Sequence, residues 1–313
     1  MGLLALLSRQ ARWALPAGVF VGILVPQLAQ LLRPLLTAAV IGTLTAALLR
    51  LDWRRFGDLA RRPALPAVLA LWQLLLTPLL LWLGSAAAGL PPDLRLALLL
   101  QAAAPPIGSA AVFALILGLD GVLAAATTVT TTLLLPLTLT PLVALLLPET
   151  GVQVDLLPFF LRVTLLVVVP FLMAAALRRL IGLERLRRSD AVLGGTNVLL
   201  LVVFAIAVMD GVTARLFDDP ALIATLSLAA CLAAVLLHLS AYLLFCRAGT
   251  TVAYTAAVLS GNRNMGLMLV ITAGTAGETF SLYVGIAQIP MYFAPLLLTP
   301  LLRRSRLRSG DGV

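Results

Sequence analysis

Long apolar stretches separated by short polar or basic segments run along the whole chain. Apolar runs of roughly twenty residues, the length needed to cross a bilayer as a helix, recur from end to end. The pattern predicts ten membrane spans, at about residues 12–32, 35–50, 64–88, 96–118, 121–147, 157–180, 191–211, 220–245, 250–276 and 279–302. The expected fold class is therefore an all-α polytopic protein that needs a lipid bilayer.

Composition and charge agree with that class. The chain is 61% hydrophobic and 11% charged, about half the charged fraction of a soluble domain. All 22 basic residues are Arg, and they lie mainly in the predicted loops, which argues against nucleic acid as a partner. The predicted spans place seventeen of the 22 on the side that holds both termini. Basic loops face the cytoplasm, so both termini are expected there.

The predicted loop at residues 148–155 divides the chain near its middle. Five predicted spans precede it and five follow. An odd number of spans per half forces the halves into opposite orientations, which is the inverted-repeat arrangement of secondary transporters. We expect the first repeat at residues 1–150 and the second at residues 151–313.

The fourth predicted span of each half is interrupted by residues that disfavour a helix. The two interruptions read Ala104-Pro105-Pro106-Ile107-Gly108-Ser109 and Ser260-Gly261-Asn262-Arg263-Asn264. Proline removes a hydrogen-bond donor and glycine lowers the cost of unwinding. Broken helices at corresponding positions of two repeats indicate a substrate site, because freed carbonyls and half-helix N-termini become ligand groups.

Arg263 is the one arginine expected at membrane depth. A lone Arg there costs from a few to more than about ten kcal/mol, unless it faces a wet cavity, a counter-charge or freed carbonyls. No acidic residue shares its expected depth, since the nearest candidates fall at span ends or in loops: Asp120, Asp190, Asp210 and Glu278. Its partner is then the protein's own carbonyls, an anionic substrate, or both in turn.

Several motifs together resemble the bile acid:sodium symporter family, in a bacterial form. The matching features are Gln73 five residues before Pro78, the break at 105–112, the Thr-rich segment 123–136, and Gly261 with Asn264. The resemblance implies ten spans, with a panel domain (spans 1, 2, 6 and 7) and a core domain (spans 3–5 and 8–10). It also implies that the fourth and ninth helices cross where they unwind, and that the protein lies in a bacterial inner membrane.

The departures from the family pattern concern its two sodium sites. The family's symporters have a Glu where this chain has Leu259, a Gln at Arg263, a Ser-Asn pair at Ala110-Ala111 and a Ser at Ala124, while a Thr is retained as Thr128. A hard cation needs several oxygen ligands. We therefore expect no sodium, metal or cofactor, with the Arg263 guanidinium as a tethered cation in place of the ions.

These features predict a secondary transporter of small organic anions that works by alternating access without sodium. The candidate substrate-binding residues are Gln73, Ser109, Thr128, Asn197, Ser260, Asn262, Arg263 and Asn264. A sodium-coupled symporter and an anion channel are the alternatives. An enzyme is not expected, since no nucleophile with a base falls at membrane depth, and no obligatory protein partner is inferred.

Each candidate also has a structural interpretation. Arg263 could lock the crossing in an inactive relative, Gln73 could form an interhelical hydrogen bond, and Thr128 could bond its own helix. His238 is the only histidine. Its position toward the cytoplasmic end of its span favours an interfacial or packing role over proton coupling.

Overall fold

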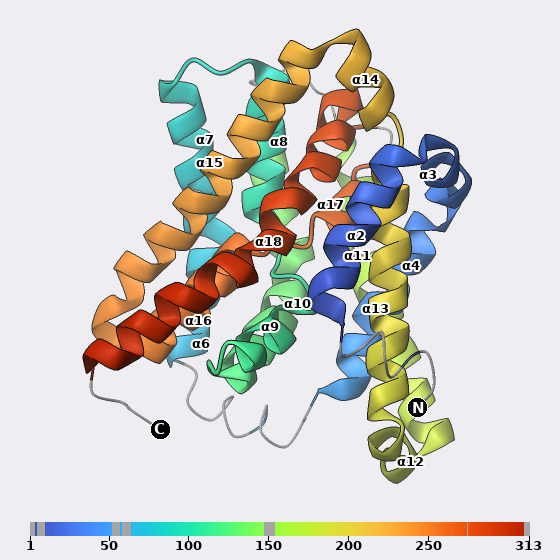
Figure 1. Ribbon diagram of the computed structural model, residues 1–313, viewed down its shortest axis with the longest axis vertical. Helices are drawn as coiled ribbons and strands as arrows, with labels where there is room; N and C mark the ends of the chain where they lie inside the picture. The colour runs from blue at the N-terminus through green and yellow to red at the C-terminus, as the bar shows by residue number, and fades with distance from the viewer. Residues whose placement is uncertain are drawn as a thin grey trace.

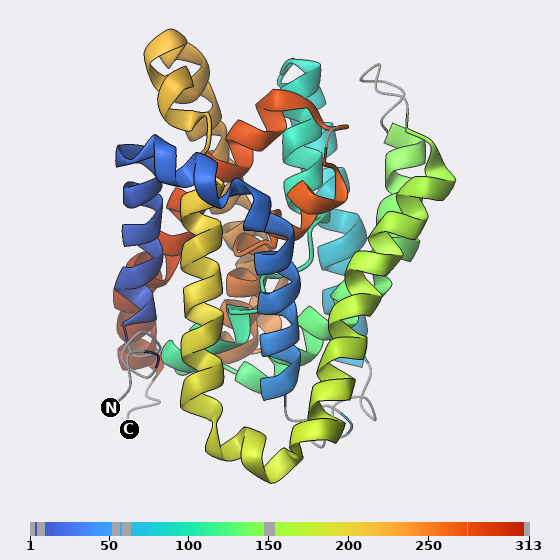
Figure 2. The same cartoon turned by 90° about the vertical axis from the view of Figure 1, so that its right-hand side faces the viewer.

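The computed structural model describes residues 4, 10–51, 57, 64–146, 154–273 and 275–309. Within these ranges every regular element is a helix, and strand-like pairing is limited to an isolated bridge between Pro106 and Arg263. Figures 1 and 2 show the long helices side by side along the long axis of the molecule. The predicted all-α class is confirmed.

The helices of the first half follow the apolar segments. They are α2 (Ala11–Leu24), α3 (Pro26–Leu32), α4 (Leu36–Arg50), α6 (Ala64–Leu71), α7 (Thr77–Ala87), α8 (Pro92–Ala103), α9 (Ala110–Ile116) and α10 (Gly121–Leu146). A 3₁₀ turn, Arg33–Leu35, joins α3 to α4, and a π-helical turn, Trp72–Leu76, joins α6 to α7. Prolines begin α3 and α8, where the missing N–H costs no bond.

The second half has helices of similar length. They are α11 (Leu156–Ile181), α12 (Leu183–Arg188), α13 (Asp190–Ala207), α14 (Val212–Asp218), α15 (Pro220–Phe245), α16 (Thr250–Gly261), α17 (Met265–Ile271) and α18 (Gly277–Ser309). The Asp155 and Asp219 side chains cap the N-termini of α11 and α15.

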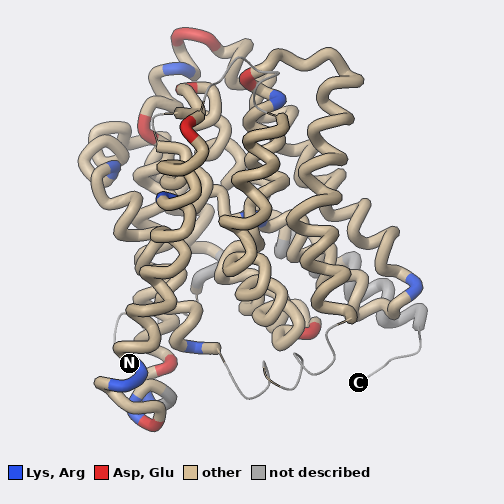
Figure 3. The backbone as a smooth tube through the Cα atoms, turned by 180° about the vertical axis from the view of Figure 1, so that it is seen from behind, with Lys and Arg blue, Asp and Glu red and all other residues tan. Residues whose placement is uncertain are grey.

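Length and composition make this a multi-pass membrane protein. In the described part of the chain, six helical stretches are long and apolar enough to cross a membrane: Pro26–Arg50, Ala64–Ala87, Gly121–Leu146, Leu156–Ile181, Asp190–Asp218 and Pro220–Ala248. Their outer surfaces carry exposed leucines such as Leu137, Leu165 and Leu228, as expected for helices that face lipid. Figure 3 shows the charged positions mainly toward the two ends of the bundle.

Both terminal helices point toward one end of the molecule. In Figure 1, α2 begins and α18 finishes in the lower half, which also holds α12. We call this the α12 end, and the end that holds α14 the α14 end. Residues 148–153 of the predicted central loop lie outside the described residues, as do the predicted basic-loop residues Arg9, Arg54, Arg55, Arg61 and Arg62.

The helices pack in two groups. The first group contains α2, α3, α4, α11 and α13, in which α13 packs on α2, α3 and α4, and α4 packs on α11. The second group contains α7–α10, α15, α16 and α18, with contacts of α7 on α8, of α9 on α10, and of α15 on both α16 and α18. The groups meet where α10 packs on α11, α2 on α18, and α17 on both α4 and α11.

Candidate functional site

The two predicted helix breaks lie against each other. The first separates α8 from α9 and the second separates α16 from α17. The Ile107 N–H donates to the Asn262 carbonyl at 2.9 Å, and the Asn264 N–H donates to the Pro105 carbonyl at 2.8 Å. These bonds form the antiparallel bridge between Pro106 and Arg263. We call this paired segment the crossover.

Local chemistry explains why each helix stops where it does. Pro105 and Pro106 cannot donate to preceding turns, and Ala104 leaves the helix with an extended ψ of 140°. In the second break, the Asn264 side chain accepts from the Leu267 N–H at 3.0 Å and so caps α17. The Asn262 amide donates back to the Val258 carbonyl at 2.8 Å, at the end of α16.

Arg263 lies inside the crossover and is only 1% exposed. Its Nε donates to the Ser260 carbonyl at 2.7 Å. Its Nη1 donates to the Ala104 carbonyl at 2.8 Å and to the Gln73 carbonyl at 3.2 Å, and its Nη2 donates to the Thr77 hydroxyl at 2.8 Å. The guanidinium therefore joins three chain segments through carbonyl and hydroxyl oxygens.

Helix breaks free the carbonyls that Arg263 binds. The Asn264 N–H, which would return to Ser260 in a continuous helix, donates to Pro105. In the π turn, the Thr77 N–H donates to the carbonyl of Trp72, five residues earlier. In the same pattern residue 78 would donate to the Gln73 carbonyl, but Pro78 has no N–H. The Gln73 carbonyl accepts instead from the Thr77 hydroxyl at 2.9 Å and from the guanidinium at 3.2 Å. The break after α8 frees the Ala104 carbonyl in the same way.

The Ser260 side chain extends this network. Its hydroxyl accepts from the Trp72 indole at 3.0 Å and from the Gln73 amide at 2.9 Å. Side-chain oxygens of Gln73, Ser109 and Asn262 are buried, and no hydrogen-bond partner for them occurs within the described residues. The crossover therefore retains polar acceptors beyond those that Arg263 satisfies.

A cavity of about 270 Å³ lies beside the crossover, between the two helix groups. Its wall is formed by α4, α9, α10, α11 and α13, and it reaches the first break at Gly108. Thr128 and Asn197 line it. The Thr128 hydroxyl already donates to Ala124 at 2.8 Å, whereas the buried Asn197 Oδ1 has no partner among the described residues. Asn197 is thus the freer polar group in this wall.

The eight candidate residues separate into three sets. Gln73, Ser260 and Arg263 bond to one another within the crossover. Ser109, Asn262 and Asn264 lie at the broken helix ends, and Thr128 with Asn197 lines the cavity. The cavity wall does not include Arg263, so in this conformation its partners are the protein's own carbonyls rather than a cavity ligand.

His238 packs inside the bundle, which agrees with the packing role among the two expected alternatives and not with the interfacial one. Its imidazole packs on Gly261, so closely that a Cβ added to that glycine would overlap the ring. The side chain therefore lies beside the second break. Nδ1 bonds the Ala234 carbonyl at 2.7 Å, so Nδ1 carries the proton, and the buried Nε2 has no partner among the described residues.

Three contributors to the site gave no clear sequence signal. Thr77 supplies the hydroxyl on Arg263, and the only hint is its position directly before Pro78. Arg50 and Asp190 both line the cavity. They lie 140 residues apart in the chain, and only the packing of α4 against α13 brings them together.

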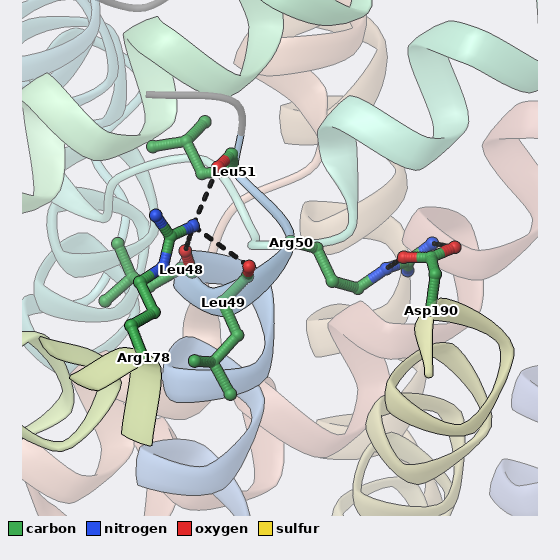
Figure 4. A network of polar contacts seen from close by, with 6 residues as sticks. All are labelled: Leu48, Leu49, Arg50, Leu51, Arg178 and Asp190. Atoms are coloured by element: carbon green, nitrogen blue, oxygen red, sulfur yellow. Dashed lines mark hydrogen bonds and ion pairs between the residues drawn. The ribbon is translucent and has the colours of Figure 1, made fainter. Parts of the chain in front are cut away.

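The two ends of the molecule carry different polar contacts. At the α12 end, Arg50 pairs with Asp190 at 2.7 Å, and Arg178 bonds carbonyls of the α4 terminus (Figure 4). At the α14 end, Arg215 pairs with Glu278 at 2.7 Å and lowers the pKa of that carboxyl through its hydrogen bonds. Arg162 of α11 donates to the Ala273 carbonyl at 3.3 Å, just beyond α17.

Comparison with known proteins agrees with this architecture. The profile of the "Sodium Bile acid symporter family" matches residues 37–216, more than half of the chain. The chain belongs to the sodium bile acid symporter family. A search of curated proteins finds no match.

Membership of the sodium bile acid symporter family makes this a membrane transporter, which at the family level favours transport over catalysis. The match covers α4 through most of α14 and therefore includes the first break. The second break, with Arg263, lies outside the matched residues.

Proposed function

We propose that this protein is a secondary transporter of small organic anions in which Arg263 replaces the sodium ions. The observation that carries the proposal is the guanidinium, 1% exposed and bonded to carbonyls of both breaks and of the π turn. A bound cation in a crossover of this kind neutralises the same oxygen atoms. Arg263 supplies that charge permanently.

The positions of the family's sodium ligands support sodium independence. Leu259, Ala110 and Ala124, which stand at three of those positions, are all fully buried. They offer no side-chain oxygen, and the carbonyls of Ala104 and Ser260 are bonded to Arg263, while those of Pro105 and Asn262 accept from backbone N–H groups. A hard cation would find too few ligands there.

We propose the ten-span, inverted-repeat architecture, with repeats at 1–150 and 151–313, as the frame for this site. The antiparallel pairing of the two breaks is the arrangement that two oppositely oriented repeats would give. The first helix group corresponds to the panel domain and the second group, with α17, to the core domain. Seventeen arginines on one side support a bacterial inner-membrane protein with cytoplasmic termini.

The way these domains meet supports alternating access. The cavity separates α4, α11 and α13 from α9 and α10, and it includes residues at the α12 end. At the opposite end, Arg162 of α11 donates to the Ala273 carbonyl, and Arg215 pairs with Glu278 of α18. Arg215 lies on α14, which continues the chain from α13 of the first group and also packs on α15. This arrangement suits a cytoplasm-open carrier whose domains rock about the crossover.

Roles for the eight candidate residues follow from their positions. We assign Asn197 and Thr128 to substrate contact. We assign Gln73, Ser260 and Arg263 to holding the crossover, and Ser109, Asn262 and Asn264 to ending its helices. In a rearranged cavity the unpartnered oxygens of Ser109 and Asn262 are available to the substrate.

The proposal is tested by counterflow in proteoliposomes. Purified protein is reconstituted with unlabelled organic anion inside, and uptake of the labelled anion is followed in choline chloride and in sodium chloride. A carrier that uses Arg263 shows transient accumulation at equal rates in both salts, and Arg263→Gln abolishes it. Uptake that requires sodium would contradict the proposal, and equilibration without accumulation would indicate a channel.

A further inference from the structure

We propose that Arg50, at the end of α4, binds the anionic head group of the substrate, and that Asp190 occupies the guanidinium until the substrate arrives. The inference rests on the proposed transport function and names the residues of the same cavity that recognise the charged head of the organic anion. The apolar body of the ligand lies along the cavity wall, and its carboxylate or sulfonate head lies at Arg50.

The composition of the cavity wall favours such a ligand. Among the described residues that line the cavity, Arg50 and Asp190 are the charged ones, and most of the others are aliphatic or aromatic, such as Leu44, Val129 and Phe171. An apolar body can bury surface against that wall. The charged head then needs a partner, and the guanidinium at the α12 end supplies it.

The existing ion pair is well suited to exchange. Arg50 Nε and Nη2 donate to the two Asp190 oxygens at 2.7 and 3.1 Å, yet the side chains are 27% and 58% exposed. Ion pairs in contact with water contribute little stability. Asp190 lies in the first turn of α13, so its carboxylate keeps both hydration and the favourable helix dipole when Arg50 leaves it. The less exposed Arg50 needs a replacement anion.

Arg178 anchors the backbone from which Arg50 extends (Figure 4). Arg178 Nη2 donates to the carbonyls of Leu48, Leu49 and Leu51 at 3.0, 2.9 and 2.7 Å. The Leu48 carbonyl also accepts from the Leu51 N–H at 3.3 Å, whereas the others lie at the helix end, where carbonyls lack intrahelical donors. The backbone on both sides of Arg50 is thereby anchored, so the Arg50 side chain extends from a fixed point of the cavity rim.

Asn197 provides a second point of recognition. It follows Asp190 by seven residues, or two helical turns, so both lie on the cavity face of α13, roughly 10 Å apart along the axis. Its Oδ1 is buried without a partner within the described chain. Asn197 can accept from a hydroxyl or amide of the ligand. The preferred substrate thus carries a hydrogen-bond donor about 10 Å from its anionic head.

The test compares a charged probe with a neutral one of the same shape. Binding of 2-naphthoate and of 2-naphthamide is measured by titration calorimetry on the full chain in nanodiscs, in sodium-free buffer. Wild type is expected to prefer the naphthoate. Arg50→Gln is expected to weaken naphthoate binding at least about tenfold and to leave naphthamide binding unchanged. Asp190→Asn is expected to tighten naphthoate binding by about threefold, because the competing carboxylate is gone.

Matched variants separate recognition from folding. Glu184→Gln removes a carboxylate from the exposed Arg188–Glu184 pair, which does not line the cavity, and should change neither affinity. Arg50→Lys keeps the charge and should retain the preference for naphthoate if Arg50→Gln does not fold.

Equal affinity of wild type for the two probes would overturn the inference, as would naphthoate binding that is weakened by Asp190→Asn. Those results would leave the transport proposal standing if counterflow of any organic anion is observed. Absence of counterflow, with the Arg50 dependence of binding intact, would instead contradict the transport proposal alone.

Discussion

At the scale of single residues, the molecule stabilises a buried guanidinium without a carboxylate. Four hydrogen bonds from Arg263 end on carbonyl and hydroxyl oxygens, and the described partners are all neutral. Burying the charge is costly, but each of these carbonyls would also be costly to bury unpaired. Arg suits this task because its planar fork has five donors in fixed directions.

Substitution of Arg263 should therefore lower the stability of the fold in addition to impairing transport. Arg263→Gln leaves carbonyls of Ser260, Ala104 and Gln73 short of donors, and the free energy of unfolding should fall by about 3 kcal/mol. Arg263→Lys keeps the charge but loses the planar set of guanidinium donors, so its free energy of unfolding should lie between those of Arg263→Gln and the wild type. Denaturant titration in a fixed detergent measures the change.

The control for this prediction is Arg188→Gln. Arg188 forms an exposed pair with Glu184, so its loss should change the unfolding free energy by less than about 0.5 kcal/mol. An Arg263→Gln protein as stable as Arg188→Gln would mean that the crossover carbonyls find other donors.

The sequence predicted the crossover residues better than their partners. It singled out Arg263 and correctly included freed carbonyls among its possible partners. It could not choose among them, because the choice depends on how closely two breaks about 160 residues apart approach each other. The carbonyl of Gln73 was also hidden, since a π turn leaves no clear trace in an apolar run.

At the scale of elements, the helices break by different local means. The first break follows from two prolines, and the second from Asn264, whose side chain caps α17. The π turn adds a third irregular element beside them. Irregular backbone at membrane depth is tolerated only where its polar groups are paired within the protein. Each irregular segment here contributes a carbonyl to Arg263.

Gly261 is the tightest packing point of the second break. A methyl group there would overlap the His238 ring, so Gly261→Ala should destabilise the protein by about 1–3 kcal/mol. Removing the ring in the double variant Gly261→Ala/His238→Ala should recover part of that loss. Unfolding free energies of the four proteins form a double-mutant cycle.

Gly84 provides the control for this cycle, because nothing lies within 4 Å of the position its Cβ would take. Gly84→Ala is expected to be neutral or slightly stabilising in its helix. Additivity of the Gly261 and His238 substitutions would show that the ring does not confine the glycine.

At the scale of the whole molecule, the two helix groups are joined by polar contacts at the α14 end and separated by a cavity that extends toward the α12 end. Breaking the α14-end contacts should favour opening on that side. In the double variant Arg162→Gln/Glu278→Gln, this opening should become about fivefold more populated, the effect of roughly 1 kcal/mol from two exposed contacts.

Thiol labelling measures this opening. The exposed Cys231 and Cys246 are replaced, and Ile271→Cys places a thiol at a buried position near Arg162. An impermeant maleimide should label it about fivefold faster in the double variant than in the parent protein. Arg188→Gln, which breaks a pair within the α12 region, should leave the rate unchanged. Equal rates in all three proteins would show that these contacts do not hold the end closed.

The hydrophobic pattern predicted the helix bounds closely where the apolar segments have clear ends. The predicted range 220–245 coincides with α15, and the predicted range 121–147 begins with α10 and covers all of its described residues. The last helix was underestimated, because α18 runs on to Ser309 through a basic segment that the hydrophobic pattern cannot include. The cavity and the contacts at either end depend on packing between groups, and no periodicity in one chain encodes them.

The most direct test of the account is whether sodium binds. Thermal unfolding of the wild-type protein in nanodiscs is measured while sodium chloride replaces choline chloride at constant ionic strength. If Arg263 takes the place of the ions, the midpoint should not move, since nothing binds the native state selectively. A saturable rise of the midpoint with sodium would contradict the account, because it would reveal a cation site that the guanidinium does not fill.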